Sequence, residues 1–123
     1  MIVDAGKKQM ARLISGIQDN NEATPICFKY VRVGDGGDST SMSQTTLDSQ
    51  ISQTKTVVPI LVGNTLIYEI ELLGSDLSSN VVSELGIFDA AIGGTMLCRV
   101  SFDSIGPITA SETLTFNFRV EIE

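Results

Sequence analysis

Residues 84–102 read Glu-Leu-Gly-Ile-Phe-Asp-Ala-Ala-Ile-Gly-Gly-Thr-Met-Leu-Cys-Arg-Val-Ser-Phe, and this stretch decides the fold. Apolar residues on both sides of a short connection predict two antiparallel strands joined by a tight turn. The first strand ends at Phe88, and Asp89 marks the start of the turn. The pair Gly93-Gly94 closes it, because glycine reaches the positive φ angles that a tight return requires. The chain is therefore predicted to be organised around this hairpin.

Two charged residues, Glu84 and Arg99, lie inside these apolar strands. If Phe88 faces Thr95 across the turn, the antiparallel register sets Glu84 directly opposite Arg99. A carboxylate and a guanidinium in this position neutralise each other and form charge-assisted hydrogen bonds. We therefore predict an ion pair between the two side chains, which requires that both lie on the same face of the sheet.

Length and composition indicate one compact, β-rich domain. The chain has 123 residues, enough for a single hydrophobic core, and aliphatic and β-branched residues dominate it. We predict a mainly β fold, an antiparallel β-sandwich with one N-terminal α-helix. The single domain spans residues 1–123, with the helix in residues 1–20 and the sandwich in residues 26–123. No charged-then-apolar leader opens the chain, so no signal peptide is expected.

The N-terminal helix is predicted over residues 3–17. Asp4 can accept hydrogen bonds from the free N–H groups of the first turn. Four apolar residues recur at the spacing of one helical face: Met10, Leu13, Ile14 and Ile17. This face packs on the sheet of its own subunit or docks onto a neighbouring subunit.

Four further strands are predicted, at residues 26–33, 57–61, 64–73 and 112–122. In the third of them the even-numbered residues from 66 to 72 are apolar, while Glu69 and Glu71 point the other way. This alternation is typical of a sheet with one buried and one solvated face. The Ser/Thr-rich residues 39–56 are predicted to form an ordered crossing segment in which a short helical turn joins Leu47 to Ile51. Disorder of the segment is the alternative.

Residue types that the sequence lacks exclude several kinds of chemistry. The chain has no histidine, which is the commonest general base. This excludes the usual catalytic triads and most zinc sites. The Gly-Asp run at residues 34–38 lacks the spacing of a calcium-binding loop, so a tight turn is favoured there. Cys27 and Cys98 lie in apolar runs, which favours two buried, reduced thiols over a disulfide. No catalytic residue, metal site or cofactor is expected.

The net charge of −7 arises entirely from the C-terminal part of the chain. Acidic and basic residues balance up to Lys55, and acidic residues prevail beyond it. Such a surface repels phosphate backbones, which argues against nucleic-acid binding. The basic start and the acidic end could meet head to tail between subunits, or both could be solvated faces.

Five stretches, in order along the chain, carry a resemblance to a known family. They are Val-Asp-Ala-Gly at 3–6, Val-Gly-Asp-Gly-Gly at 33–37, Gln-Thr-Thr-Leu at 44–47, the hairpin sequence at 84–99, and Pro-Ile at 107–108. Together they resemble small tail-fibre and baseplate-associated proteins of tailed bacteriophages, including the N-terminal attachment domains of tail fibres. The family usually carries a lysine after the Pro-Ile turn, whereas this chain continues with Thr109-Ala110-Ser111.

The resemblance implies a structural virion protein of a phage tail, a tail-fibre or baseplate attachment or adaptor component that is not an enzyme. Its partners would be copies of itself, with a trimer favoured, and other tail or baseplate proteins, without nucleic acid or membrane insertion. It would reside in the virion tail after assembly in the host cytoplasm. The residues expected to specify the fold and its subunit contacts are Glu84, Gly86, Phe88, Asp89, Gly93, Gly94 and Arg99.

Three alternatives remain open. A receptor- or carbohydrate-binding fibre tip would need exposed aromatic residues, of which Tyr30, Tyr68 and five phenylalanines are available. A head–tail connector or capsid decoration protein would share most of the same sequence features. A wall hydrolase would need paired carboxylates across a cleft, but Glu69 and Glu71 are neighbours on one face of one strand.

Overall fold

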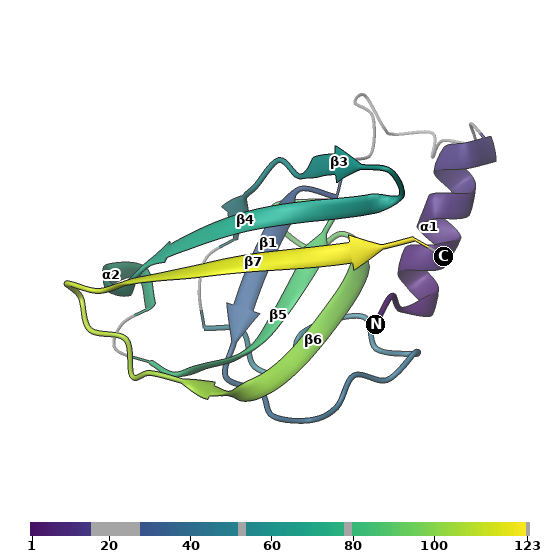
Figure 1. Ribbon diagram of the computed structural model, residues 1–123. Coiled ribbons are helices and arrows are strands. Elements are labelled where there is room, and N and C mark those ends of the chain that lie inside the picture. Colours follow the sequence, from purple (N-terminus) through teal and green to yellow (C-terminus); the bar gives the residue numbers. More distant parts are fainter. Residues whose placement is uncertain (16–27, 52–53, 78–79, 123) are drawn as a thin grey trace.

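The computed structural model describes residues 1–15, 28–51, 54–77 and 80–122 (Figure 1). Within these residues the strands form two antiparallel sheets preceded by a helix, which confirms the predicted mainly β, sandwich-like fold with an N-terminal helix. None of the described helices is long and apolar enough to cross a membrane. In chain order the elements are α1 (Asp4–Ser15), β1 (Tyr30–Gly34), β2 (Lys55–Thr56), β3 (Ile60–Val62), β4 (Thr65–Leu73), α2 (Gly74–Leu77), β5 (Val82–Phe88), β6 (Met96–Ile105) and β7 (Thr113–Glu121).

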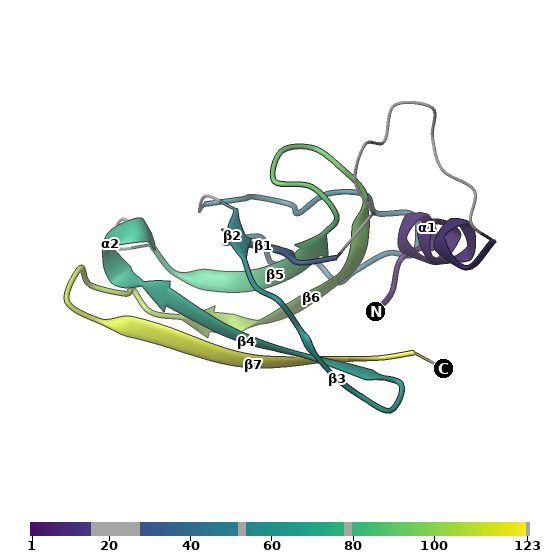
Figure 2. The same ribbon diagram turned by 90° about the horizontal axis from the view of Figure 1, so that it is seen from above.

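The strands lie in two layers (Figure 2). One sheet has the order β2-β1-β5-β6 and the other β3-β4-β7, and every neighbouring pair is antiparallel. Residues 55–62 cross from one layer to the other, because they begin as β2 and end as β3. The helix α1 lies at one end of the sandwich and contacts β6.

Alternating side chains of β4 supply one wall of the hydrophobic core. Tyr68, Ile70 and Leu72 are buried, and Glu69 and Glu71 are exposed, as the sequence alternation predicts. A buried aliphatic side chain contributes about 1.5–3 kcal/mol relative to an exposed one. The buried β4 side chains belong to one hydrophobic cluster with side chains of the other sheet, and this cluster joins the two layers. The residues from the other sheet are Val31, Val33, Leu85, Ile87 and Leu97.

The predicted hairpin is present as β5 and β6, but its predicted register is wrong. Arg99 lies opposite Gly86, and Glu84 lies opposite Ser101. Two one-residue shifts are the cause. Phe88 pairs with Met96 and not with Thr95, and a β-bulge between Phe88 and Ile87, which pairs with Cys98, leaves Leu97 without a cross-strand partner. An extra residue on one strand shifts every pair beyond it.

The N-terminal residues pair with β6 beside the bulge. The Leu97 carbonyl accepts a hydrogen bond from the Val3 N–H at 3.0 Å. A bridge between Ile2 and Cys98 continues this pairing along the edge of β6. A Cβ at Gly6 would lie 2.5 Å from the Leu97 carbonyl oxygen, so the first turn of α1 approaches the bulge closely.

The crossing segment is ordered where the structure describes it, but the predicted helical turn between Leu47 and Ile51 is wrong. These residues form turns and bends and an isolated bridge from Gly34 to Gln50. The Ile51 N–H donates to the Val33 carbonyl, so this backbone pairs with β1 instead of with itself. Leu47 is buried, and the four-residue spacing of the two apolar residues reflects separate contacts with the core.

Several predicted boundaries shift. The described part of α1 ends at Ser15, and the first strand begins at Tyr30. The strand expected at residues 57–61 forms only as β3, and β6 extends to Ile105 into the predicted turn. Met10 packs against the core as the helical stripe predicts. The other members of that stripe and one cysteine lie outside the residues whose side chains the structure describes: Leu13, Ile14, Ile17 and Cys27.

Candidate functional site

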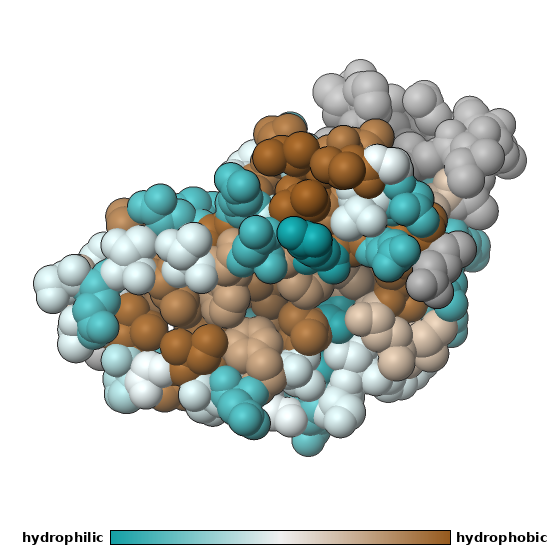
Figure 3. All heavy atoms as spheres, in the orientation of Figure 1, coloured by the Kyte–Doolittle hydropathy of each residue, from teal (hydrophilic) through white to brown (hydrophobic). Residues whose placement is uncertain are grey.

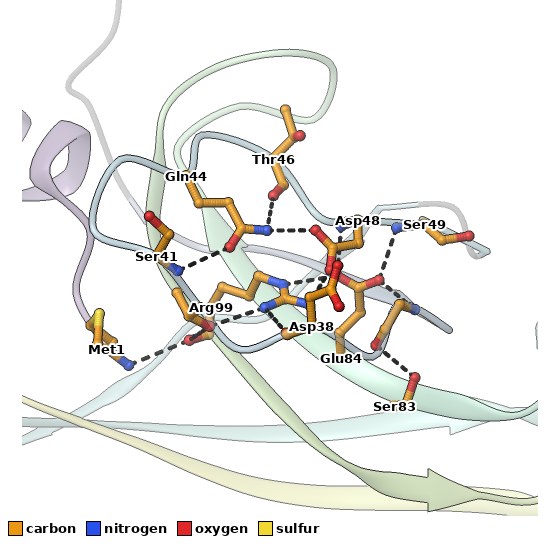
Figure 4. A network of polar contacts seen from close by, with 12 residues as sticks. Met1, Asp38, Ser41, Gln44, Thr46, Asp48, Ser49, Ser83, Glu84 and Arg99 are labelled. Atoms are coloured by element: carbon orange, nitrogen blue, oxygen red, sulfur yellow. Dashed lines mark hydrogen bonds and ion pairs between the residues drawn. The ribbon is translucent and has the colours of Figure 1, made fainter.

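The carboxylate of Glu84 lies at the centre of the site and is completely buried (Figure 4). Its Oε2 accepts hydrogen bonds from the backbone N–H groups of Gly36 at 2.6 Å and Ser49 at 2.9 Å. Its Oε1 accepts from the Asp48 N–H at 2.8 Å and from the Arg99 Nε at 2.9 Å. Four donors, one of them charged, therefore compensate a carboxylate that has left water.

Arg99 completes the arrangement and is also fully buried. Its Nη2 contacts the Asp48 Oδ2 at 3.0 Å, and the Asp48 side chain is 32% exposed. Its Nη1 donates to the Asp38 carbonyl at 2.8 Å and to the Thr40 Oγ1 at 3.1 Å. The predicted ion pair with Glu84 is thus present, but diagonally across the strands, with further partners from the crossing segment.

The backbone of Arg99 ties the chain's first residue to the same place. The Met1 ammonium donates to the Arg99 carbonyl oxygen at 3.3 Å, and the Arg99 N–H donates to the Met1 carbonyl at the same distance. The Thr40 hydroxyl also donates to the Arg99 carbonyl oxygen at 3.0 Å. We call the bonded residues Glu84, Arg99, Asp48, Asp38, Thr40, Gly36 and Ser49 the Glu84–Arg99 network.

Three glycines permit the close approach of the crossing segment. A Cβ at Gly36 would collide with the Glu84 carboxylate, and one at Gly34 would collide with the Ser49 carbonyl oxygen. A Cβ at Gly86 would lie 2.8 Å from the Leu47 Cδ2. The absence of a side chain at position 86, directly opposite Arg99, leaves room for Leu47 against the sheet.

The remaining residues singled out in the sequence gather at the turn. The Asp89 carboxylate accepts from the Thr95 N–H at 2.7 Å and from the Gln9 Nε2 at 3.1 Å. Gly93 and Gly94 have φ angles of 65° and 77°, in the left-handed region that favours glycine. The seven residues thus divide into the network around Glu84 and a second cluster around the turn.

Phe88 lies between these two groups. It is buried in a small hydrophobic cluster with Val3, Leu47 and Met96. The guanidinium carbon of Arg32 lies 3.8 Å from the centroid of its ring, a cation–π contact. Phe88 therefore contacts residues on both sides: Leu47 beside the Glu84–Arg99 network, and Arg32 beside the turn.

Sequence reasoning missed Arg32, Thr40 and Asp48 as members of the site. Arg32 interrupts an apolar strand, and that interruption was the one available signal. Thr40 and Asp48 lie in a segment rich in similar polar residues, where no periodicity separates bonded from solvated side chains.

Neither arrangement resembles catalytic machinery. Burial raises the pKa of the Cys98 thiol to about 12, and Cys98 is free and only 2% exposed, in keeping with the predicted reduced thiol. In the described ranges of the chain, no cluster of three or more acidic or cysteine side chains could hold a metal ion. Glu69 and Glu71 lie exposed on one strand, side by side along a shallow surface hollow.

No family model matches this chain, and no curated protein matches it. The resemblance to phage tail proteins therefore rests on the five stretches of sequence alone.

The buried carboxylate makes stability depend on pH. Burial by itself raises the pKa of Glu84, but hydrogen bonds from Arg99 and from three backbone N–H groups outweigh burial and place the pKa below its ordinary value of 4.5. The unfolded state then binds the proton more readily, so the stabilisation is complete above about pH 4.5 and is lost as the pH falls through the folded-state pKa.

We expect wild-type protein to lose unfolding free energy more steeply below about pH 4.5 than a Glu84→Gln variant, which has no proton to take up at this position. Urea denaturation of both proteins over a series of acidic pH values measures the difference. Equal slopes for the two proteins would contradict the assignment of a lowered pKa to Glu84.

Proposed function

We propose that this protein is a structural component of a phage tail, which acts as a tail-fibre or baseplate attachment or adaptor unit and is not an enzyme. The observation that carries the proposal is the convergence of the resembling stretches. Residues 3–6, 33–37, 44–47 and 84–99 are far apart in sequence and meet around the Glu84–Arg99 network and Phe88. The buried charged residues Glu84 and Arg99, which could otherwise suggest a catalytic site, bond to each other and to Asp48.

An exposed apolar segment supports a role in assembly. Val58 and the three residues of β3 are between 51% and 76% exposed. They contribute to the hydrophobic area above β4 in Figure 3. Among the described strands β3 pairs only with β4, so it is an edge of its sheet, and it carries no charged residue that would oppose pairing with another chain. Exposed apolar groups on an open edge are typical of surfaces that contact a protein.

Copies of the protein itself, with a trimer favoured, and other tail or baseplate proteins are the proposed partners. In a cyclic trimer the contacts are heterologous, so the exposed edge of one unit would contact a different surface of the next. The proposed location is the virion tail, after assembly in the host cytoplasm.

The direct test is quantitative mass spectrometry of purified particles of the phage that encodes the chain, with gold-labelled antibody to place it on the particle. We expect a fixed copy number in the tail. Absence from the particles would contradict the proposal, and label on the head would favour the head–tail or decoration alternative.

The exposed segment gives a prediction in solution. We expect Leu61→Asp to lower the mass of the protein measured by light scattering after size exclusion, because a charge would have to be buried in the contact. Leu73→Asp is the matched control, since Leu73 is exposed at the opposite end of β4. A wild-type oligomer that survives Leu61→Asp and dissociates with Leu73→Asp would assign the contact to another surface.

The receptor-binding alternative has less support. Tyr68 is buried, and its hydroxyl donates to the Phe28 carbonyl at 2.6 Å. Tyr30 is half-buried, and Phe88 lies in the core. An aromatic platform for a sugar needs exposed ring faces, which these three residues do not supply. Loss of binding on a glycan array after Tyr30→Ala would favour this alternative.

A further inference from the structure

Arg32 is a buried cation, and its hydrogen-bond partners among the described residues are all neutral. The residue is 7% exposed. Its Nε donates to the Thr54 Oγ1 at 3.1 Å, and its Nη2 donates to the carbonyl oxygens of Ala90 at 2.9 Å and Gly93 at 2.8 Å. Below the guanidinium lies the face of Phe88. These contacts use the hydrogens of two nitrogens and offer no negative charge.

Among the described residues, no carboxylate forms an ion pair with Arg32. No acceptor atom of these residues receives a hydrogen bond from the Arg32 Nη1. The charge of Asp89 acts on Arg32 without an ion pair between the two side chains, and the Asp89 oxygens accept from Thr95 and Gln9. Burial lowers the pKa of Arg32, and the charge of Asp89 partly opposes this effect. A buried charge without a counter-ion is costly unless something supplies one.

The same arginine lines a surface hollow of about 720 Å³. Gln50 and Thr54 add polar groups to its wall, and Ile51, Ala91 and Ile92 add apolar ones. Ile92 is 93% exposed at its rim. The β5–β6 connection that forms one wall stands off the four-stranded sheet, on the side away from β4 and β7 (Figure 2).

This wall is fixed before any ligand arrives. Arg32 bonds to the carbonyls of Ala90 and Gly93, and the Thr54 hydroxyl donates to the Ala91 carbonyl at 2.7 Å. Three carbonyls in four residues are therefore bonded to side chains of neighbouring segments. A preformed wall reduces the ordering cost that a ligand must overcome.

We propose that this hollow binds a carboxylate carried on a small apolar group. The carboxylate accepts from the Arg32 Nη1 and supplies the missing counter-charge, while the apolar part contacts Ile51 and Ile92. A single free nitrogen and a single positive charge suit a monoanionic carboxylate better than a doubly charged phosphate, which binds best to several donors. The inference goes beyond the proposed function and does not depend on it.

Two sources offer this chemistry, a free organic acid and an acidic side chain beside an apolar residue on a partner protein. Isothermal titration and amide NMR shifts of the full chain distinguish them. The probes are isovalerate, the neutral isostere isovaleramide, inorganic phosphate, and the blocked peptide acetyl-Leu-Glu-Leu-amide. We expect millimolar binding of isovalerate or the peptide, with shifts at residues 51, 54 and 91–93, and weaker binding of phosphate. The tighter of the two carboxylates identifies the source.

Two variants separate binding from folding. Arg32→Gln should weaken carboxylate binding at least about tenfold, whereas isovaleramide should bind wild type and variant alike. Ile92→Ser leaves the arginine and its hydrogen bonds in place, and should weaken binding severalfold through the lost apolar contact. Binding of isovaleramide as tight as isovalerate, or no carboxylate binding at millimolar concentrations, would overturn the proposal.

Discussion

Arg99→Met should lower the free energy of unfolding by about 3–5 kcal/mol, the usual cost of removing one partner from a buried ion pair. Methionine retains much of the length of the side chain but removes the four donor contacts to Glu84, Asp48, Asp38 and Thr40. The Glu84 carboxylate would remain buried without its charged partner. Chemical denaturation, followed by far-UV circular dichroism, measures the loss.

The matched control is Arg119→Met, because Arg119 is exposed on the outer face of β7. Its effect should stay within about 0.5 kcal/mol. Adding Glu84→Gln to Arg99→Met should restore part of the lost stability, since neither position 84 nor position 99 then buries a charge. If the single variant at position 99 were as stable as the control, the network would not contribute to the fold as the structure indicates.

Gly36→Ala should destabilise the protein by about 3 kcal/mol, because it adds an overpacking cost to the loss of a hydrogen bond to a charged group. A Cβ at this position would collide with the Glu84 carboxylate and the Asp48 Cβ. The Glu84 carboxylate has no space to retreat, since three other donors fix it. Thermal and urea denaturation measure the effect.

The adjacent glycine provides a control that differs by one position. A Cβ at Gly37 would meet no atom within 4 Å. Gly37→Ala should therefore leave stability unchanged or slightly raised, because alanine restricts the unfolded chain. If both variants lost a similar amount of unfolding free energy, the cause would be the backbone conformation at residues 36 and 37. Contact with the Glu84 carboxylate would then not be the cause.

The hairpin and the buried face of β4 could be predicted from sequence because both depend on local patterns. Alternation along Tyr68, Ile70 and Leu72 needs no knowledge of the rest of the chain. The bulge at Leu97 could not be predicted, because either register satisfies the apolar pattern near the turn. The Leu97 carbonyl bonds to the Val3 N–H, which lies more than ninety residues away in sequence, so no local pattern indicates this contact.

The other residues that bond to Glu84 and Arg99 could not be predicted either, because tertiary contacts position them. Glu84 and Arg99 stood out as charges within apolar strands, and the structure brings them together. Asp48 and the backbone N–H of Gly36 come from a polar segment whose path over the sheet is set by tertiary contacts. The four-residue spacing of Leu47 and Ile51 predicted a helical turn, but the two side chains pack in separate hydrophobic clusters.

We conclude that the Glu84–Arg99 network is a closed structural element and not an open site. Native-state amide hydrogen exchange of Gly36, Asp48 and Ser49 tests this most directly, because their N–H groups donate to the buried carboxylate. We expect these loop amides to exchange as slowly as those of the β5–β6 core, through global unfolding alone. Exchange at the rate of an exposed loop, with the core still protected, would contradict it.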